Sequence, residues 1–134
     1  MIFLATKADQ IVDTDIENTR HLLAEMTKDI ARKASLAGIN TKTEAISAIR
    51  CGKTKRLGKE TVINGDAELD GLIKHVDVSH PCIPGYIPSP AEFDELFCFK
   101  SPRFIPPKLP NNQKCFPHIR MDKIIDDLLG EKCL

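Results

Sequence analysis

The sequence has no excess of either charge and no long apolar run. Its 134 residues include 19 Lys and Arg against 19 Asp and Glu, so the formal net charge is zero. A balanced charge gives no electrostatic reason to expect nucleic acid or an anionic membrane as a partner. No apolar stretch approaches the roughly 18 residues of a transmembrane helix, so we also expect no integral membrane segment.

A signal peptide and closely spaced cysteines are missing as well. The first ten residues contain neither a basic leading segment nor a small-residue cleavage site. The five cysteines are odd in number and lie far apart, with no Cys-x-x-Cys pair. This pattern favours free thiols in a reduced, cytoplasmic protein over a disulfide scaffold.

The sequence contains no complete phosphate-binding loop. Gly52-Lys53-Thr54 matches the end of the P-loop pattern GxxxxGK[ST], but the first glycine of that pattern would fall on Ser47. A P-loop must also open a helix, and the basic residues after Thr54 predict none. We therefore reject a phosphate-loop role for this segment and predict no catalytic residue.

The part of the chain up to residue 51 predicts a strand-helix-strand unit. Residues 2–5 form a continuous apolar run, which is typical of a strand in a parallel sheet covered on both faces. Apolar residues then recur at helical spacing over residues 16–34, and Thr14 and Glu17 have the spacing of a capping box. Residues 43–49 predict a second strand, which a right-handed crossover would place parallel to the first.

The middle of the chain, residues 52–117, predicts an irregular, Pro-rich insertion. All nine prolines lie from Pro81 to Pro117, where they argue against regular elements. Within this insertion we predict only a weak strand at 61–63, a turn at Asn64-Gly65 and a short helix near 91–97.

Residues 118–134 predict a C-terminal helix that Gly130 closes. Its apolar face comprises Met121, Ile124, Ile125, Leu128 and Leu129. Taken as one partial domain, the whole chain is predicted to be α/β: the C-terminal part of a P-loop NTPase-type parallel sheet, with flanking helices and the Pro-rich segment.

The tetrapeptide Thr6-Lys7-Ala8-Asp9 follows the first strand and matches the guanine-reading pattern [NT]KxD. In that chemistry the aspartate carboxylate accepts two hydrogen bonds, from the guanine ring and from its exocyclic amine, and adenine offers no such donor pair. Nucleotides bind beyond the carboxyl ends of strands in open α/β sheets, which is where this motif lies. On four residues alone, an ordinary polar loop remains the other interpretation.

Ser47 and Ala48 come at the end of the second predicted strand. A loop of small residues there can bring a backbone amide up to the guanine carbonyl oxygen. Alone, the pair is uninformative, because a strand with small side chains looks the same. The pair becomes informative through the order of segments along the chain, which is strand, TKAD, helix, strand, SA. A nucleotide-binding fold has about this order and spacing.

One other group of residues carries side chains suited to a metal site or a Cys/His hydrolase. His80, Cys82, Cys98, Cys115 and His118 could supply tetrahedral zinc ligands, but their spacings are not those of a known zinc finger. Cys98 lies between two phenylalanines, as a buried small apolar residue would. We predict no metal site and no Cys/His hydrolase, because no local signature supports either.

The order of these segments resembles the carboxyl-terminal part of the YcjX-like P-loop NTPases, a family of stress-associated predicted GTPases. The segments that carry the resemblance are FLATKADQI, LLAEMTKDIARKASLAGI, AISAIRC, PCIPGYIPS and FPHIRMDKIIDDLLGEKCL, which together span essentially the whole chain.

The resemblance implies a guanine-nucleotide site (GTP or GDP) formed by Lys7 and Asp9, with Thr6, Ser47 and Ala48 as supporting loop positions. The family's P-loop, magnesium ligands and switch regions lie upstream of the base-reading strand, and this sequence has no counterpart for them. We therefore expect a C-terminal fragment that binds Mg²⁺ and hydrolyses GTP only together with the missing N-terminal half. The alternative is a stand-alone α/β module that docks a protein partner and has no nucleotide role.

Overall fold

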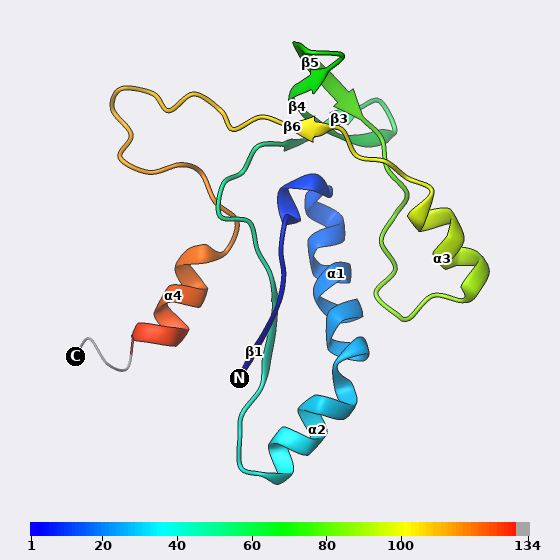
Figure 1. Ribbon diagram of the computed structural model, residues 1–134, viewed down its shortest axis with the longest axis vertical. Helices are drawn as coiled ribbons and strands as arrows, with labels where there is room; N and C mark the ends of the chain where they lie inside the picture. The colour runs from blue at the N-terminus through cyan, green and yellow to red at the C-terminus, as the bar shows by residue number, and fades with distance from the viewer. Residues whose placement is uncertain (131–134) are drawn as a thin grey trace.

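The computed structural model describes residues 1–130, with the side chain of Phe97 excepted. The chain opens with strand β1 (Ile2–Ala5), the 3-10 turn η1 (Ala8–Gln10), helices α1 (Asp13–Met26) and α2 (Lys28–Leu36), and strand β2 (Lys42–Ala45) (Figure 1). β1 and β2 are parallel, with Ala5 opposite Ala45. The predicted strand-helix-strand unit is thus confirmed, although its second strand ends at Ala45 and not at Ile49.

The architecture is α/β, as predicted, but its parallel sheet is small. Within residues 1–130 this sheet has two strands, β1 and β2. It does not by itself establish the predicted P-loop-type sheet. α1 and α2 run along one side of the strand pair, and α4 (Met121–Leu129) lies on the other side (Figure 1).

The start of α1 differs from the prediction. The helix begins at Asp13, and the expected Thr14–Glu17 capping box is not formed. Two distant side chains cap the helix instead: the Val12 amide donates to Nε2 of His80 at 3.0 Å, and the Asp13 amide donates to Oγ1 of Thr54 at 2.8 Å. These acceptors satisfy amides that have no partner within the helix.

The single predicted helix is divided at Thr27, between α1 and α2. The Thr27 hydroxyl donates to the Leu23 carbonyl at 2.8 Å, a back-bond that competes with the helical ladder and bends helices. At the end of α2, Gly38 has a φ of 76° and the Ile39 amide donates to the Ala34 carbonyl. This left-handed cap confirms the predicted end at Gly38.

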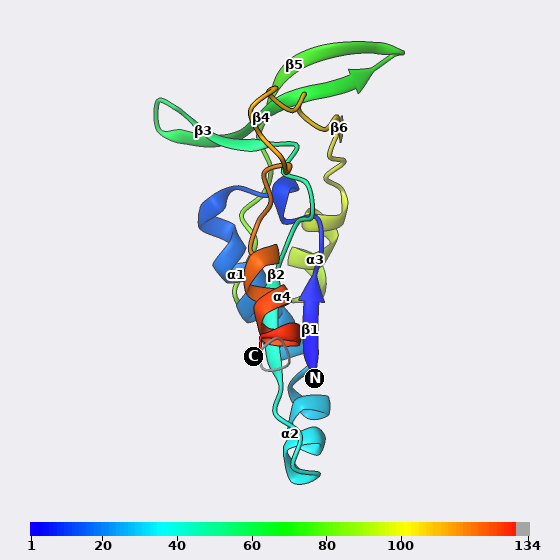
Figure 2. The same cartoon turned by 90° about the vertical axis from the view of Figure 1, so that its left-hand side faces the viewer.

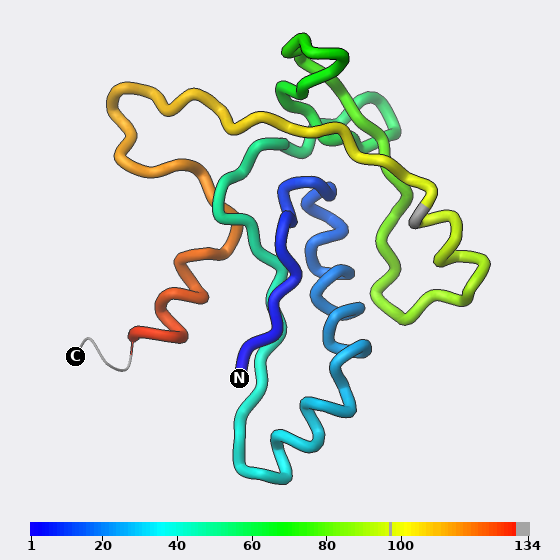
Figure 3. Tube along the Cα trace, in the orientation of Figure 1, coloured from blue at the N-terminus to red at the C-terminus, as the bar shows by residue number. Residues whose placement is uncertain are grey.

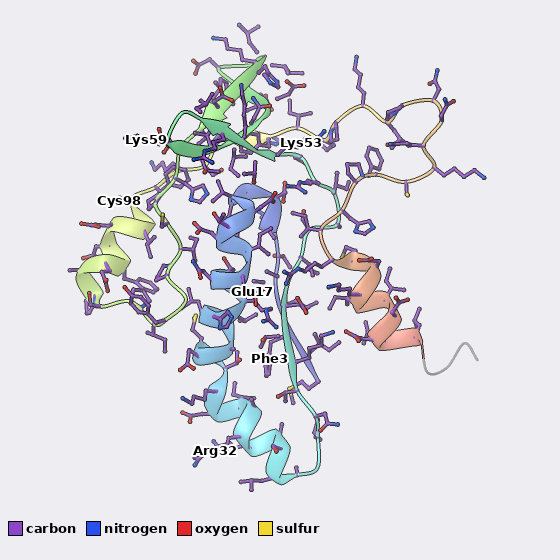
Figure 4. All side chains as sticks on the ribbon, turned by 180° about the vertical axis from the view of Figure 1, so that it is seen from behind. Phe3, Glu17, Arg32, Lys53, Lys59 and Cys98 are labelled. Atoms are coloured by element: carbon purple, nitrogen blue, oxygen red, sulfur yellow. The ribbon has the colours of Figure 1, made fainter. Side chains whose placement is uncertain are left out.

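The prediction of an irregular segment over residues 52–117 is wrong for its first part. Three antiparallel strands, β3 (Lys53–Leu57), β4 (Glu60–Leu69) and β5 (Leu72–Val78), form a meander beyond the carboxyl ends of β1 and β2 (Figure 2). Figure 4 shows Lys53 at the start of β3 and Lys59 at the turn that follows it. β6 (Arg103–Phe104) adds to β4 on the side of β3.

The turn predicted at Asn64-Gly65 lies inside β4. The turn signals that operate are Gly58, with a φ of 61°, and Asp70-Gly71, where both φ values are positive as a type I′ hairpin requires. Asn64 suits a strand here because its side-chain Nδ2 donates to Oδ1 of Asp77 on β5 at 2.6 Å. Gly65 suits it because a Cβ there would lie 3.0 Å from the Phe104 ring.

The two remaining helices were both predicted. α3 (Pro90–Phe97) begins with a capping box formed by Ser89 and Glu92. α4 begins after Arg120 and reaches Leu129, and residues 131–134 of the predicted terminal helix lie outside the described residues. The apolar face of α4 is only partly covered: Ile124 is buried, whereas Ile125, Leu128 and Leu129 are exposed.

Two small apolar clusters meet at the loop that joins β1 to α1. One consists of Ala8, Ile16, Ala45 and Ile119, and the other of Val12, Ile63, Ala67 and Phe104. The first packs α1 against the parallel strands, and the second packs the meander against the start of α1. The loop between Ala5 and Val12 is therefore held from both sides.

Candidate functional site at the ends of the parallel strands

The loop after β1 is anchored to the loop after β2. The Ile46 amide donates to the Ala5 carbonyl at 2.8 Å, and the Ala8 amide donates to the Ile46 carbonyl at 3.1 Å. Lys7 has a φ of 61°, a left-handed conformation that is uncommon for a residue with a side chain. This reversal leaves Thr6 and Lys7 exposed while Ala8 and Asp9 turn inward.

Asp9 is the buried polar centre of the site. It is 7% exposed, and its two carboxylate oxygens have different partners. The Ser47 hydroxyl lies 2.7 Å from Oδ1, and the Cys51 amide donates to Oδ2 at 3.2 Å. A carboxylate offers about four acceptor positions, so these two bonds orient Asp9 and leave room for two further donors.

All five residues predicted for the site line one cavity of about 530 Å³: Thr6, Lys7, Asp9, Ser47 and Ala48. The structure thus brings together two loops that are separated by about 40 residues of chain. Ala48 is exposed, and its amide has no hydrogen-bond partner among residues 1–130. The residues that line the cavity therefore include Asp9, which has spare acceptor capacity, and Ala48, whose amide has no partner within residues 1–130.

Six further residues line this cavity and were not predicted from the sequence: Gln10, Ile46, Ile49, Cys51, Phe104 and Met121. Gln10, Ile46, Ile49 and Cys51 adjoin the predicted loops, so proximity in sequence could have indicated them. Phe104 comes from β6 and Met121 from the first turn of α4. No local pattern marks these last two, because only the return of the chain across the meander brings them to the cavity.

The segment Gly52-Lys53-Thr54 packs against the backbone of Asp9 through Gly52. It enters strand β3, whereas a P-loop would open a helix. A Cβ on Gly52 would lie 2.8 Å from the Asp9 carbonyl oxygen and 2.5 Å from Cγ2 of Ile63. Only glycine lets the backbone approach Asp9 this closely, so this residue has a packing role and its rejection as a phosphate loop is consistent with the fold.

The Cys51 thiol lies beside Asp9, and its acidity depends on that carboxylate and on burial. Burial raises the pKa of the Cys51 thiol, and the nearby charge of Asp9 and its hydrogen bond raise it further. A raised pKa lowers the thiolate fraction, and the thiolate is the reactive form.

We therefore expect iodoacetamide to modify Cys51 roughly tenfold more slowly than the exposed Cys82, Cys98 and Cys115 at mildly alkaline pH. Asp9→Asn should accelerate the modification of Cys51 without changing the rates at the other three thiols. Peptide mass spectrometry after timed quenching measures each rate. Equal rates at all four thiols would contradict the proposed environment of Cys51.

The histidines and cysteines weighed as zinc ligands are dispersed. Among residues 1–130, no three His, Cys, Asp or Glu side chains gather in a way that could hold a metal ion. His80 has a different role: besides capping α1, its Nδ1 lies 2.7 Å from the Pro81 carbonyl, which makes Nδ1 the donor and Nε2 the acceptor. Cys98, which was expected to be buried, is exposed.

The helices of the described part of the chain were compared with the requirements of a membrane span. Over residues 1–130, none combines the length and the apolar character needed to cross a bilayer.

The geometry defines an α/β protein with an oriented carboxylate at the carboxyl ends of two parallel strands. Comparison with known sequences gives its family: the pattern of the YcjX-like family, DUF463, matches residues 1–133. The chain belongs to this family, as its resemblance indicated.

A curated relative from Shewanella oneidensis strain MR-1, named Ras-like GTPase YcjX, is 31% identical over 139 aligned residues. The match covers 98% of this chain but 28% of that relative, so the chain spans little more than a quarter of the relative's length. The family is therefore GTPase-related.

Proposed function

We propose that this chain supplies the guanine-recognition part of a GTP-binding domain. Asp9 carries the proposal, because its carboxylate is buried, oriented by two bonds and still able to accept two more. Guanine offers a matching pair of donors, its ring N–H and its exocyclic amine. The free amide of Ala48 lies at the same cavity and would donate to the guanine carbonyl oxygen.

The other lining residues would act by shape. The exposed Lys7 would lay its aliphatic stem along the base, while Phe104 and Met121 offer apolar surface to a planar ring. Ser47 would hold Asp9 through its hydroxyl, and Thr6 would contribute to the mouth of the cavity. Adenine would leave the buried acceptors of Asp9 unpaired, which is the physical basis of the proposed base preference.

The phosphates and the metal ion require other residues. No GxxxxGK[ST] pattern occurs in the sequence, and a phosphoryl group and its Mg²⁺ need that cradle. We propose that a phosphate-binding half outside these residues provides it, with β1 joining a larger parallel sheet. On this proposal the chain by itself binds the base weakly and does not hydrolyse GTP.

The alternative is a protein-interaction module without a nucleotide role. Such a module would dock its partner on the exposed apolar side chains of α4, which are Ile125, Leu128 and Leu129. A larger sheet in a complete GTP-binding domain would cover the same face, so this observation does not favour the module over the nucleotide site. The base pocket distinguishes them, because a docking module has no reason to prefer one purine.

The test is saturation-transfer difference NMR on this chain with guanosine monophosphate (GMP) and adenosine monophosphate (AMP) at millimolar concentration. We expect GMP to bind at least about tenfold better than AMP, because two hydrogen bonds to a charged acceptor are lost with AMP. Equal transfer to both nucleotides, or transfer to neither, would overturn the proposed function. Release of phosphate from GTP by the purified chain would overturn the prediction that it is inactive alone.

A further inference from the structure

The second loop of the site is held by a segment that arrives from the far end of the chain. After its excursion through residues 105–116 (Figure 3), the chain returns at Pro117–Arg120 beside Ser47. Ser47 and Ile119 exchange two backbone hydrogen bonds of 3.1 and 2.9 Å, and the Arg50 amide donates to the Pro117 carbonyl at 2.7 Å. The loop that carries Ser47 and Ala48 thus depends on this returning segment for its position.

Arg120, the last residue of that segment, occupies a constrained position. Its φ is 54°, in the left-handed region where a side chain is strained. Such a conformation persists only where the surroundings impose it. Here its guanidinium binds two carboxylates from different elements: Glu44 of β2 at 2.9 Å and Glu17 of α1 at 3.3 Å. Figure 4 shows Glu17 on α1.

The two carboxylates do not depend on Arg120 equally. Glu17 also binds Arg20, which lowers the pKa of the Glu17 carboxyl more than Arg120 does. Glu44 is 6% exposed, and Arg120 is its sole side-chain partner among residues 1–130. A buried carboxylate without a cation is strongly unfavourable, so Glu44 ties Arg120 to the end of β2.

This ion pair lies close in sequence to the base site on both segments that it joins, the end of β2 and the residues before α4. Glu44 precedes Ser47 by three residues, and Ile119 directly precedes Arg120. Ile119 is itself buried in the cluster with Ala8, Ile16 and Ala45. Holding Arg120 at Glu44 therefore holds Ile119 against Ser47, whose hydroxyl orients Asp9.

We infer that Arg120 is a positioning residue of the base site, which acts on Asp9 through Glu44, Ile119 and Ser47 without touching the nucleotide. The inference rests on the proposed guanine-recognition function for its ligand. Arginine suits the role because its donors are spread over a rigid planar fork, with Nη1 on Glu44 and Nη2 on Glu17, whereas the three donors of lysine share one nitrogen.

Arg120→Gln is the test variant, and Arg20→Gln is its matched control, because it removes an arginine from Glu17 while leaving Glu44 paired. Amide hydrogen exchange of Ser47 and Ile119 is the readout that needs no ligand, and the GMP-to-AMP preference is the second. We expect Arg120→Gln to accelerate exchange at both amides at least about tenfold more than at the amides of β2, and to reduce the base preference. Arg20→Gln should stay within about twofold of the wild type on both measures.

A double variant, Glu44→Gln with Arg120→Gln, removes the uncompensated buried charge and should recover protection at Ser47 in part. Exchange that rises uniformly over the chain, or not at all, would overturn the positioning role and leave Arg120 as general packing. Failure of both the single and the double variant to fold would overturn it as well. If wild-type chain does not discriminate GMP from AMP, the proposed function fails, while the exchange comparison still decides whether Arg120 positions the loop.

Discussion

Asp9→Asn should reverse the base preference of this site, so that xanthosine monophosphate binds better than GMP. Xanthine carries a carbonyl where guanine carries its exocyclic amine. The amide nitrogen of asparagine can donate to that carbonyl, whereas the carboxylate of Asp9 can only accept. A hydrogen bond to a charged group contributes about 1.5–3 kcal/mol, so we expect GMP affinity to fall about ten- to a hundredfold.

The measurement is competition between the two nucleotides in saturation-transfer difference NMR on the purified variant. Asp29→Asn is the matched control: it makes the same change at an exposed position on α2, far along the chain from the site loops. It should leave the preference for GMP unchanged. An Asp9→Asn variant that folds and keeps the wild-type preference would refute base reading by Asp9.

The largest loss of stability is expected from Phe104→Ala. Phe104 is 8% exposed, packs in the cluster with Val12, Ile63 and Ala67, and lies against Gly65. Truncation of a buried phenylalanine costs about 3–5 kcal/mol, because the lost burial is compounded by a cavity. For a chain of this size we expect the melting temperature to fall by roughly 10 °C or more.

Thermal unfolding followed by circular dichroism checks this prediction. Phe116→Ala is the control, because Phe116 is an exposed phenylalanine on the long loop before α4, and its loss should change stability by no more than about 0.5 kcal/mol. Phe104 also lines the base cavity, so at a temperature where both variants are folded, Phe104→Ala alone should weaken GMP binding. Equal destabilisation by the two substitutions would show that Phe104 is not a core residue.

The parts of the fold that sequence predicted are those governed by contacts close in sequence. The apolar run of β1, the helical spacing of α1 and the apolar face of α4 each depend on residues within one or two turns. The parallel pairing of β1 with β2 followed because a strand, a helix and a second strand have few ways to pack.

The meander was missed for a definite reason. β4 alternates buried residues such as Ile63 with polar ones such as Asn64, and Asn-Gly is usually a strong turn signal. In the folded chain, Asp77 binds Asn64, and the Phe104 ring lies against Gly65. Both partners are distant in sequence, so no local pattern could show that this dipeptide continues a strand.

The proximity of the two candidate loops could be predicted from sequence, because strand ends and small polar motifs are local features and parallel strands bring their carboxyl ends to one edge. The environment of those loops could not. His80 caps α1 across 68 residues, and Arg120 binds Glu44 across 76. Contacts of such separation depend on the return path of the whole chain, so the tertiary structure alone decided that His80 caps α1, that Arg120 pairs with the buried Glu44, and that Phe104 and Met121 line the cavity beside Asp9.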